Sequence, residues 1–395
     1  MLETLLGGIA IGAPLLAVYS YAIYPLVLAL VAGLAQACHD ARYVAAKSER
    51  RVRAPDELPR IGVVISAYNE QRHIRARVEN LLALDYPAHL VSFYVGSDGS
   101  KDDTGRILAE MAHPQLKAFV FEANRGKANV LNDLVSRVEE PIVAFSDANT
   151  YFAADALKRL AAHFGDSRVG GVSGELRLLG SAGDNQDSLY WRIEQVLKFF
   201  ESRIGGLLGA NGAIYAIRRE LWRPLAPDTI CDDFCVAMNV SAAGHRLVYE
   251  PNAIATEDTP DSISEEYKRR VRIGIGNYQA LWRHPEYLFR TSAGTKFSYL
   301  SHKVLRWLTP HLVLVGLLAC IPLALRSSAW ACLLAAQIAG IAVAALLYAR
   351  SASGGKLPGL LRIPAFLFAL NWAFLVGSIK FVRGTYGGAW ARTSR

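Results

Sequence analysis

The sequence predicts an α/β domain carried between membrane-spanning helices. Between residues 60 and 281, short apolar runs alternate with helical patterns, as in crossover connections on a mainly parallel sheet. Charge-free runs flank this region, and the longest extends from Thr4 to Cys38. Of the 395 residues, 52% are hydrophobic and 20% are charged. This composition excludes a disordered or fibrous chain and a small domain held together by disulfides.

The balance of charge indicates which partners suit the chain. It has 43 Lys and Arg against 35 Asp and Glu, a net charge of +8. Such an excess suits an anionic membrane face or a phosphate-bearing ligand. The charge balance alone does not name a partner. Together with the charge-free runs and the motifs of the chain, it leads us to expect the lipid bilayer and a phosphate-bearing ligand as partners, and no nucleic acid. The five cysteines are odd in number and complete no zinc motif, which is typical of a reduced protein facing the cytosol.

The N-terminal run predicts a transmembrane helix over residues 1–38, because it exceeds the roughly 20 apolar residues that span a bilayer. It is too long for a signal peptide and lacks a basic leader, so we expect it to be retained. A basic linker over residues 39–59 follows, with Arg42, Lys47, Arg50, Arg51 and Arg53. Positive charge on this side predicts a multi-pass protein of the cell membrane whose middle part is cytoplasmic.

Residues 301–395 predict a C-terminal membrane region with charge-free runs at 307–325, 327–349 and 363–379. Three crossings would leave outside a tail that carries Lys380, Arg383, Arg392 and Arg395. One interpretation makes the last run, which contains Pro364 and Asn371, re-entrant or interfacial. The other makes residues 303–310 an interfacial helix and redistributes the crossings. The sequence leaves both open.

Four apolar runs in the middle of the chain predict buried strands at residues 61–66, 91–96, 118–121 and 142–145. A polar cluster follows each of them: Ala67-Tyr68-Asn69-Glu70, Ser97-Asp98-Gly99-Ser100, Asn124-Arg125-Gly126-Lys127 and Ser146-Asp147-Ala148-Asn149. Any one cluster is explained by a helix cap or a turn. Ligands bind at the carboxyl ends of parallel strands, so the four clusters together predict one site.

Two features of these clusters indicate which ligands the site takes. Asp147 and Asn149 are two residues apart, so in an extended segment both side chains could face one hard cation, Mg²⁺ or Mn²⁺. Lys127 and the helix start behind it would provide positive charge for a diphosphate.

These four motifs, followed by Gly209-Ala210-Asn211-Gly212, Asp232-Asp233 and Arg269-Arg270-Val271-Arg272, resemble in order those of membrane-embedded family-2 glycosyltransferases. That family includes the hyaluronan, chitin, cellulose and poly-N-acetylglucosamine synthases. The resemblance extends from Arg60 to Arg283 and to the membrane layout. It implies a cytosolic, Rossmann-like GT-A catalytic domain over residues 60–300. It also implies inverting, metal-dependent transfer from a nucleoside diphosphate sugar, a UDP-sugar, to a saccharide acceptor at the membrane, building cell-surface or extracellular polysaccharide.

The resemblance also implies roles for the residues that would bind the donor. The uracil and ribose pocket would be lined by Ala67, Tyr68 and Glu70. Asp98 would recognise the edge of the base or ribose, and Lys127 would neighbour the nucleotide. Asp147 and Asn149 would hold the metal on the diphosphate. The family usually has Asp at both ends of that last motif, so Asn149 predicts weaker metal binding.

The resemblance implies that Asp233 is the general base. Its neighbour Asp232 would bind the substrate. A literal Thr256-Glu257-Asp258 occurs further on, but it matches the stretch that follows the base in that family, so we interpret it as a decoy. Asp233 also has a physical case. Its apolar neighbours are Phe234, Val236 and Met238. They limit the solvation of its carboxylate and thereby raise its basicity.

The family's Gln-x-x-Arg-Trp motif is altered here, because Ile273 takes the place of the Trp. Arg270 and Arg272 can bind phosphate oxygens and stabilise a departing diphosphate, which makes Arg272 a catalytic candidate. The resemblance implies that the Trp ring supports the acceptor sugar in processive members of the family. Ile273 has no such ring. Asn211 and Gly212, with residues 276–279, are candidates for the acceptor site, and we consider Tyr278 or Trp282 as a substitute aromatic platform.

Two other functions remain alternatives. An enzyme that adds a single sugar to a lipid-linked acceptor is favoured by Ile273, because that residue offers no stacking face. A transporter or membrane scaffold that merely binds a nucleotide is disfavoured by the placement of Asp233 and Arg272. The layout also allows a homo-oligomer or an export partner.

Overall fold

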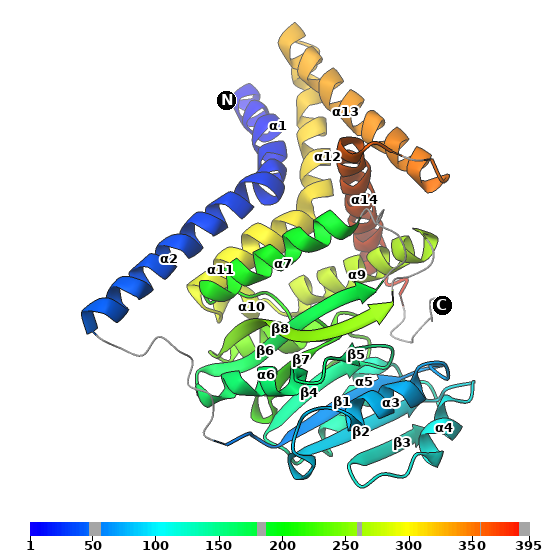
Figure 1. The fold of residues 1–395 in the computed structure, drawn as a ribbon. Coiled ribbons are helices and arrows are strands. Elements are labelled where there is room, and N and C mark those ends of the chain that lie inside the picture. The colour runs from blue at the N-terminus through cyan, green and yellow to red at the C-terminus, as the bar shows by residue number, and fades with distance from the viewer. Residues whose placement is uncertain (47–56, 180–186, 259–262, 356, 387–395) are drawn as a thin grey trace.

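An α/β domain forms one end of the molecule, and helices from both ends of the chain extend away from it (Figure 1). The structure is a computed structural model, and it describes residues 1–46, 57–179, 187–258, 263–355 and 357–386. The longer helices of the domain are α3 (Ile74–Leu82), α4 (Thr104–Glu110), α5 (Lys127–Val135), α6 (Ala156–Ala162), α7 (Asp187–Arg203), α8 (Asp232–Ala242) and α9 (Ile263–Arg283). Short helices connect them: η2 (Ala88–Leu90), η3 (His163–Gly165), η4 (Arg219–Leu221) and α10 (Glu286–Phe289).

Within the described residues, the domain is built on one eight-stranded sheet with the order β3-β2-β1-β4-β7-β6-β8-β5. The strands are β1 (Ile61–Ala67), β2 (Val91–Asp98), β3 (Leu116–Phe121), β4 (Ile142–Asp147), β5 (Tyr151–Phe152), β6 (Val169–Leu179), β7 (Tyr215–Arg218) and β8 (Arg246–Asp258). The four predicted strands are confirmed, and they pair in parallel in the order β3-β2-β1-β4. The sheet as a whole is mixed, because β7 pairs antiparallel with both β4 and β6.

Both faces of the sheet are covered by helices, which explains why the strands are continuous apolar runs. Every residue of β1 is buried. Val64 belongs to one core cluster, shared with residues of α5 and α8. Its neighbour Ile65 belongs to the opposite cluster, shared with residues of α3 and α6. Successive side chains thus pack against opposite layers, and the carboxyl ends of β1, β2 and β4 are held at one edge.

The N-terminal helix is longer than predicted, and it is bent. α1 (Leu2–Val18), the π-helical turn η1 (Tyr19–Ile23) and α2 (Tyr24–Ala46) are continuous, and Leu2–Ala46 is long and apolar enough to cross a membrane. The bend lies at the π turn beside Pro25, which lacks the N–H needed for a regular helical bond (Figure 1). The first part of the predicted linker 39–59 is therefore helical, whereas residues 47–56 lie outside the described residues.

Three C-terminal helices are also long and apolar enough to cross a membrane: Ala293–Ala324, Ser328–Ala352 and Gly359–Val382. The first joins α11 (Ala293–Ser298), η5 (Tyr299–Val304) and α12 (Leu305–Ala324). Residues 303–310 are thus part of this longer helix and do not form a separate one. α13 (Ser328–Ala352) follows. After η6 (Gly359–Leu361), α14 (Arg362–Val382) runs unbroken past Asn371, so the described backbone contains no re-entrant loop there.

Contacts between these helices place the basic end of α14 beside the α/β domain. His311 near the start of α12 lies 3.0 Å from Ser378 Oγ near the end of α14, so the two helices run antiparallel. α14 also packs along α9, where an added Cβ at Gly377 would lie 3.0 Å from the backbone of Gly274. Lys380 and Arg383 therefore lie on the side of the α/β domain.

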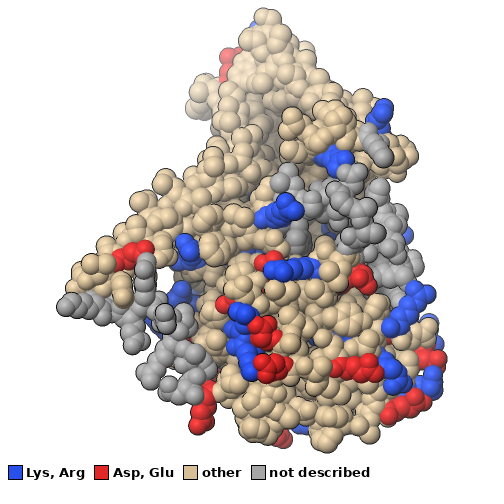
Figure 2. Space-filling model, in the orientation of Figure 1, with Lys and Arg blue, Asp and Glu red and all other residues tan. Residues whose placement is uncertain are grey.

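Charged side chains are distributed unevenly over the surface. On the face drawn in Figure 2, Lys, Arg, Asp and Glu gather on the α/β domain, whereas α1, α12 and α13 are almost without them. Large hydrophobic side chains are exposed on these helices, among them Leu318, Ile338 and Leu346. Such a surface is suited to lipid and unsuited to water.

Candidate active site

The polar clusters that follow the predicted strands do meet at one edge of the sheet. Ala67 at the end of β1 is paired with Ser97 of β2, and Ser66 is paired with Asp147 of β4. The parallel register therefore brings the ends of three strands together. Tyr68 and Glu70 follow β1 directly and are half-buried, whereas the side chain of Ala67 is buried in the core.

Asp98 is the last residue of β2, and its carboxylate binds the backbone of the loop that leads to Lys127. Its side chain is fully buried, and its two oxygens accept hydrogen bonds from the backbone N–H groups of Arg125 (2.8 Å) and Gly126 (2.9 Å). Gly126 has a φ of 87°, a conformation that favours glycine, and it caps α5. In this structure Asp98 fixes the start of α5, and thereby the position of Lys127.

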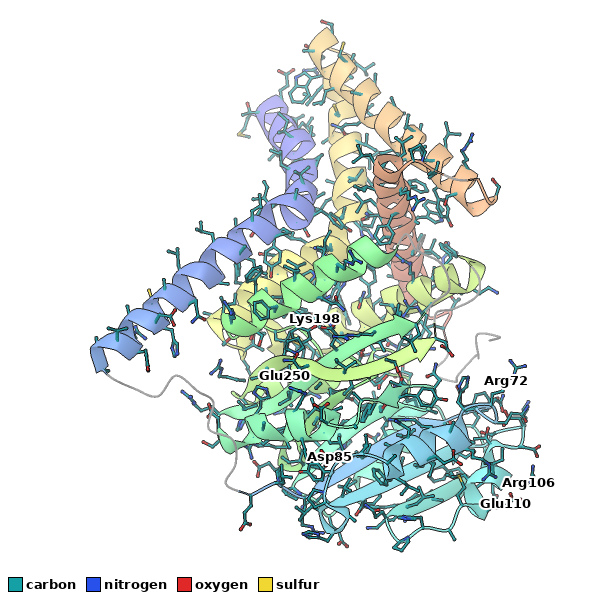
Figure 3. All side chains as sticks on the ribbon, in the orientation of Figure 1. Arg72, Asp85, Arg106, Glu110, Lys198 and Glu250 are labelled. Carbon is teal, nitrogen blue, oxygen red and sulfur yellow. The ribbon has the colours of Figure 1, made fainter. Side chains whose placement is uncertain are left out.

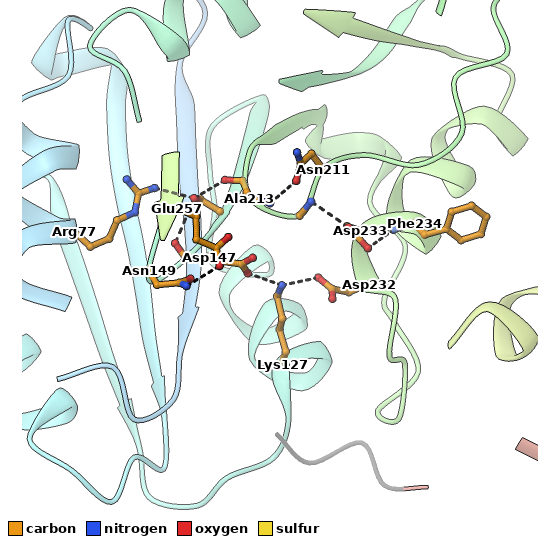
Figure 4. Close-up of polar contacts among 12 residues, drawn as sticks. Arg77, Lys127, Asp147, Asn149, Asn211, Ala213, Asp232, Asp233, Phe234 and Glu257 are labelled. Atoms are coloured by element: carbon orange, nitrogen blue, oxygen red, sulfur yellow. Dashed lines mark hydrogen bonds and ion pairs between the residues drawn. The ribbon is translucent and has the colours of Figure 1, made fainter. Parts of the chain in front are cut away.

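Lys127 lies between two carboxylates that come from different elements (Figure 4). Its Nζ is 2.8 Å from Asp147 Oδ1 at the end of β4 and 3.1 Å from Asp232 Oδ2 at the start of α8. Burial alone would lower the pKa of Lys127. The charges of Asp147 and Asp232 outweigh burial and raise the pKa above its usual value. Lys127 is therefore a permanent positive charge at the edge of the sheet.

Glu257 also reaches this cluster, although the segment Thr256-Glu257-Asp258 is not assigned as the base motif. Asn149 Nδ2 donates a hydrogen bond to Glu257 Oε1 at 2.9 Å. The contact arises because β5 pairs with β8, which places Thr256 opposite Tyr151 and brings Glu257 beside Asn149. Asp147 and Glu257 line the cavity described below, and Asn149 lies beside Glu257 (Figure 4).

Asp233 differs from its neighbour Asp232 in what its carboxylate contacts. Its oxygens accept hydrogen bonds from the backbone N–H groups of Phe234 (2.7 Å) and Gly212 (3.1 Å). Asp232 is instead paired with Lys127. Burial and the nearby charge of Asp232 raise the pKa of Asp233 to about 6, against the opposing effect of Lys127. The half-buried Asp233 can therefore accept a proton near neutral pH.

These groups line one cavity of about 520 Å³. Its floor includes Lys127, Asp147, Glu257, Asp232 and Asp233, together with the segment Gly209–Ala213. Its other walls come from α7, α9, η5, α12 and α14. Of the predicted residues, Asn211 and Gly212 lie in the floor of this cavity, whereas it is not lined by Ala67, Tyr68, Glu70, Asp98 or Asn149, all of which the structure describes.

α9 contributes the predicted arginines to the opposite wall. Arg270, Arg272 and Ile273 all line the cavity. The guanidinium of Arg270 lies 4.6 Å from the centroid of the Phe366 ring, and this contact anchors its stem against α14. The positive side chains of α9 therefore line the same cavity as the acidic groups.

The aromatic wall of the cavity does not come from the residues expected to replace the missing Trp. Tyr278 and Trp282 line a second cavity of about 430 Å³ between α9, α12 and α14. Trp307 of α12 instead lines the first cavity, beside Phe234 at a centroid distance of 5.8 Å. Tyr278 and Trp282 project from another face of α9, so neither lines the cavity that contains Asp233.

Arg77 is a second residue of this region that sequence reasoning missed. Its guanidinium is fully buried, donates a hydrogen bond to Ser146 Oγ at 2.9 Å and lies over the ring of Phe152. Burial lowers its pKa to about 9. Because Ser146 immediately precedes Asp147, Arg77 fixes the end of β4. A lone arginine in an amphipathic helix gives no sequence signal for such a role.

The fold is that of glycosyltransferases of the GT-A type. Residues 59–276, more than half of the chain, match the family described as "Glycosyltransferase like family 2", and the chain belongs to that family. It is therefore a family-2 glycosyltransferase related to polysaccharide synthases, as the sequence motifs predicted.

The curated relatives include poly-β-1,6-N-acetyl-D-glucosamine synthases. The protein of Staphylococcus epidermidis is 27% identical over 231 residues, which cover 56% of this chain and 56% of the relative. That of Staphylococcus aureus (strain COL) is 27% identical over 236 residues, 58% of this chain and 57% of the relative. The chain thus matches little more than half the length of these relatives.

Among solved structures, a mannosyltransferase from Pyrobaculum calidifontis, PcManGT in complex with GDP-Man and Mn²⁺, shares the fold. Its TM-score is 0.68 at 21% sequence identity, and the match covers 98% of this chain and 100% of that one. The similarity therefore includes the helices at both ends of the chain.

Proposed function

We propose that the enzyme transfers a sugar from a nucleoside diphosphate sugar to a hydroxyl group of a saccharide acceptor at the membrane. Asp233 carries this proposal, because it is a carboxylate of raised pKa in a cavity between the acidic edge of the sheet and the apolar helices. A UDP-sugar donor and a cell-surface or extracellular polysaccharide product are supported by the similarity to the N-acetylglucosamine synthases. The catalytic domain would face the cytoplasm.

The transfer is a single inverting displacement. Asp233 takes the proton of the acceptor hydroxyl while that oxygen bonds to the anomeric carbon. The bond from this carbon to the diphosphate oxygen breaks, and the electron pair leaves with the diphosphate. Lys127, Arg270 and Arg272 stabilise the negative charge that develops there. Asp232 is less suited as the base, because its charge is already neutralised by Lys127.

Mg²⁺ or Mn²⁺ fits the donors at the end of β4, because hard cations prefer oxygen ligands. Asp147, Asn149 and Glu257 would hold the ion, and Glu257 restores the negative charge that Asn149 lacks. When bound, the ion would supply Lewis-acid stabilisation of the leaving diphosphate. The presence of Mn²⁺ beside GDP-Man in the structure of similar fold supports this proposal.

The proposal is tested by incubating the purified full-length chain with a panel of UDP- and GDP-sugars, Mn²⁺ and a panel of mono- and oligosaccharide acceptors, free and lipid-linked. We expect release of nucleoside diphosphate from donors of one nucleotide class, with UDP expected. The matched control is Asp233→Asn, which should release far less. A wild-type enzyme that bound these donors and released no diphosphate from any of them would support the scaffold alternative.

A second expected result concerns pH. Asp233 must be deprotonated to act as the base, and its pKa is raised to about 6. The value of kcat/KM should therefore be constant above that pH and should fall roughly tenfold per pH unit below it. Diphosphate release at subsaturating donor between pH 4.5 and 8 measures this. A rate that stays flat down to pH 4.5 would contradict a base of raised pKa.

A further inference from the structure

A second charged cluster lines the cavity on its membrane side, away from the acidic edge of the sheet. Glu194 of α7 contacts Arg306 of α12 (2.5 Å), His302 of η5 (3.2 Å) and Lys303 of η5 (3.7 Å). Arg306 and His302 are buried, whereas Lys303 is partly exposed to the cavity. Glu194 is thus already occupied by three basic side chains, and these contacts join α7 to the apolar helices.

Lys198 adds a positive charge that this cluster does not neutralise. It follows Glu194 by one helical turn, so the two side chains share a face of α7. Lys198 is half-buried in the cavity wall and makes no hydrogen bond or ion pair within the part of the chain that the structure describes (Figure 3). Burial, followed by the charge of Lys303, lowers the pKa of Lys198.

Positive charge exceeds negative charge in this region. Lys198, Lys303 and Arg306, here called the membrane-side lobe, carry three positive charges, and Glu194 lies within ion-pair distance of Lys303 and Arg306. A second carboxylate, Glu201, contacts His302 at 2.6 Å, and Lys198 forms no ion pair among the described residues. Placing positive charges together away from water is costly unless an anion accompanies them. The transfer step uses none of the three, because Lys127, Arg270 and Arg272 stabilise the diphosphate. The lobe is therefore suited to an anion other than the donor.

We propose that the membrane-side lobe binds the phosphate of a lipid carrier to which the acceptor sugar is attached. This inference rests on the proposed function and specifies its acceptor. Lys198 and Lys303 contact the phosphate oxygens through charge-assisted hydrogen bonds. Trp307, Leu370 and Phe374 provide apolar walls for the start of an aliphatic chain, and they belong to helices suited to lipid. The same cavity contains Asp233, so a sugar attached to this phosphate can present its hydroxyl group to the base.

The test measures binding of farnesyl phosphate, farnesol and inorganic phosphate to the full-length protein in detergent, by equilibrium dialysis of labelled compounds. We expect farnesyl phosphate to bind at least tenfold more tightly than farnesol or inorganic phosphate. Lys198→Met and Lys303→Met, which keep the aliphatic stem, should each weaken this binding roughly ten- to a hundredfold. Lys198→Arg should restore it. The matched control is Lys158→Met, at a surface ion pair with Asp85 remote from the cavity.

Each other outcome would overturn a stated part of the inference. If farnesol bound as tightly as farnesyl phosphate, recognition of the phosphate would be excluded. If inorganic phosphate bound as tightly as farnesyl phosphate, recognition of the lipid would be excluded. Unchanged binding in folded Lys198→Met and Lys303→Met would exclude the lobe. Diphosphate release from the donor panel is measured in parallel. Normal release without preference for farnesyl phosphate contradicts this inference alone, whereas absence of release contradicts the proposed function itself.

Discussion

Asp233→Asn is expected to reduce sugar transfer on the order of 10²–10⁴-fold, the usual effect of removing a general base. Donor affinity should change by less than about threefold, because an amide keeps the size of the carboxylate and still accepts a hydrogen bond from Gly212. The effect should therefore fall on kcat. Single-turnover transfer and equilibrium binding of UDP to the same preparation would measure the two quantities separately.

Asp232→Asn is the matched comparison, because the two residues are adjacent at the start of α8. This substitution weakens the ion pair with Lys127, so it should weaken donor binding while leaving a functional base. Near-normal turnover in Asp233→Asn, combined with complete loss in Asp232→Asn, would transfer the role of base to Asp232.

The parallel half of the fold could be predicted from local sequence, and the antiparallel part could not. β1, β2 and β4 are buried apolar runs bounded by polar turns, so each is recognisable on its own. β7 is only Tyr215–Arg218, and its place between β4 and β6 depends on pairing with residues about 40 and 70 positions away. No local pattern specifies such pairing.

The same limit explains which parts of the site were predicted. Lys127 and Asp147 each follow a buried strand or its loop, so the rule for strand ends locates them. Glu257 depends on the pairing of β5 with β8, and its neighbour Asn149 is 108 residues away. Comparison with a family motif places Glu257 after the base and does not show that it lies beside Asn149. Lys198 and Trp307 line the cavity. The sequence patterns of their helices indicate an apolar face, but they do not indicate which residues line a cavity.

The packing of the C-terminal helices places the basic end of α14 beside the α/β domain, a position that charge counting alone left open. Three crossings would place Lys380 and Arg383 on the outer side. In the structure, α12 leads away from the α/β domain, and α14 returns to it and packs along α9. The intervening α13 packs against both α12 and α14. Gly274 of α9 and Gly377 of α14 allow these two helices to pack closely, which brings α14 against the catalytic domain. A hydropathy pattern does not reveal such a contact.

Chelation with EDTA is expected to stop transfer, and Glu257→Gln is expected to weaken Mn²⁺ binding by at least tenfold, the scale seen for groups that support a metal site. The reason is charge. Asp147 is shared with Lys127 and Asn149 is neutral, so Glu257 supplies the second carboxylate for a divalent cation. Mn²⁺ titration followed by electron paramagnetic resonance, in the presence of UDP, measures affinity independently of turnover.

Two further variants distinguish this role of Glu257 from a general effect of charge. Glu250→Gln removes a carboxylate from the same strand, where it pairs with His163 at 2.8 Å, and should leave Mn²⁺ affinity unchanged. Asn149→Asp places a carboxylate beside Glu257, so it should tighten Mn²⁺ binding and destabilise the metal-free protein through like-charge repulsion. Transfer that survives exhaustive EDTA treatment, with unaltered affinity in Glu257→Gln, would mean that Lys127, Arg270 and Arg272 stabilise the diphosphate without a metal ion.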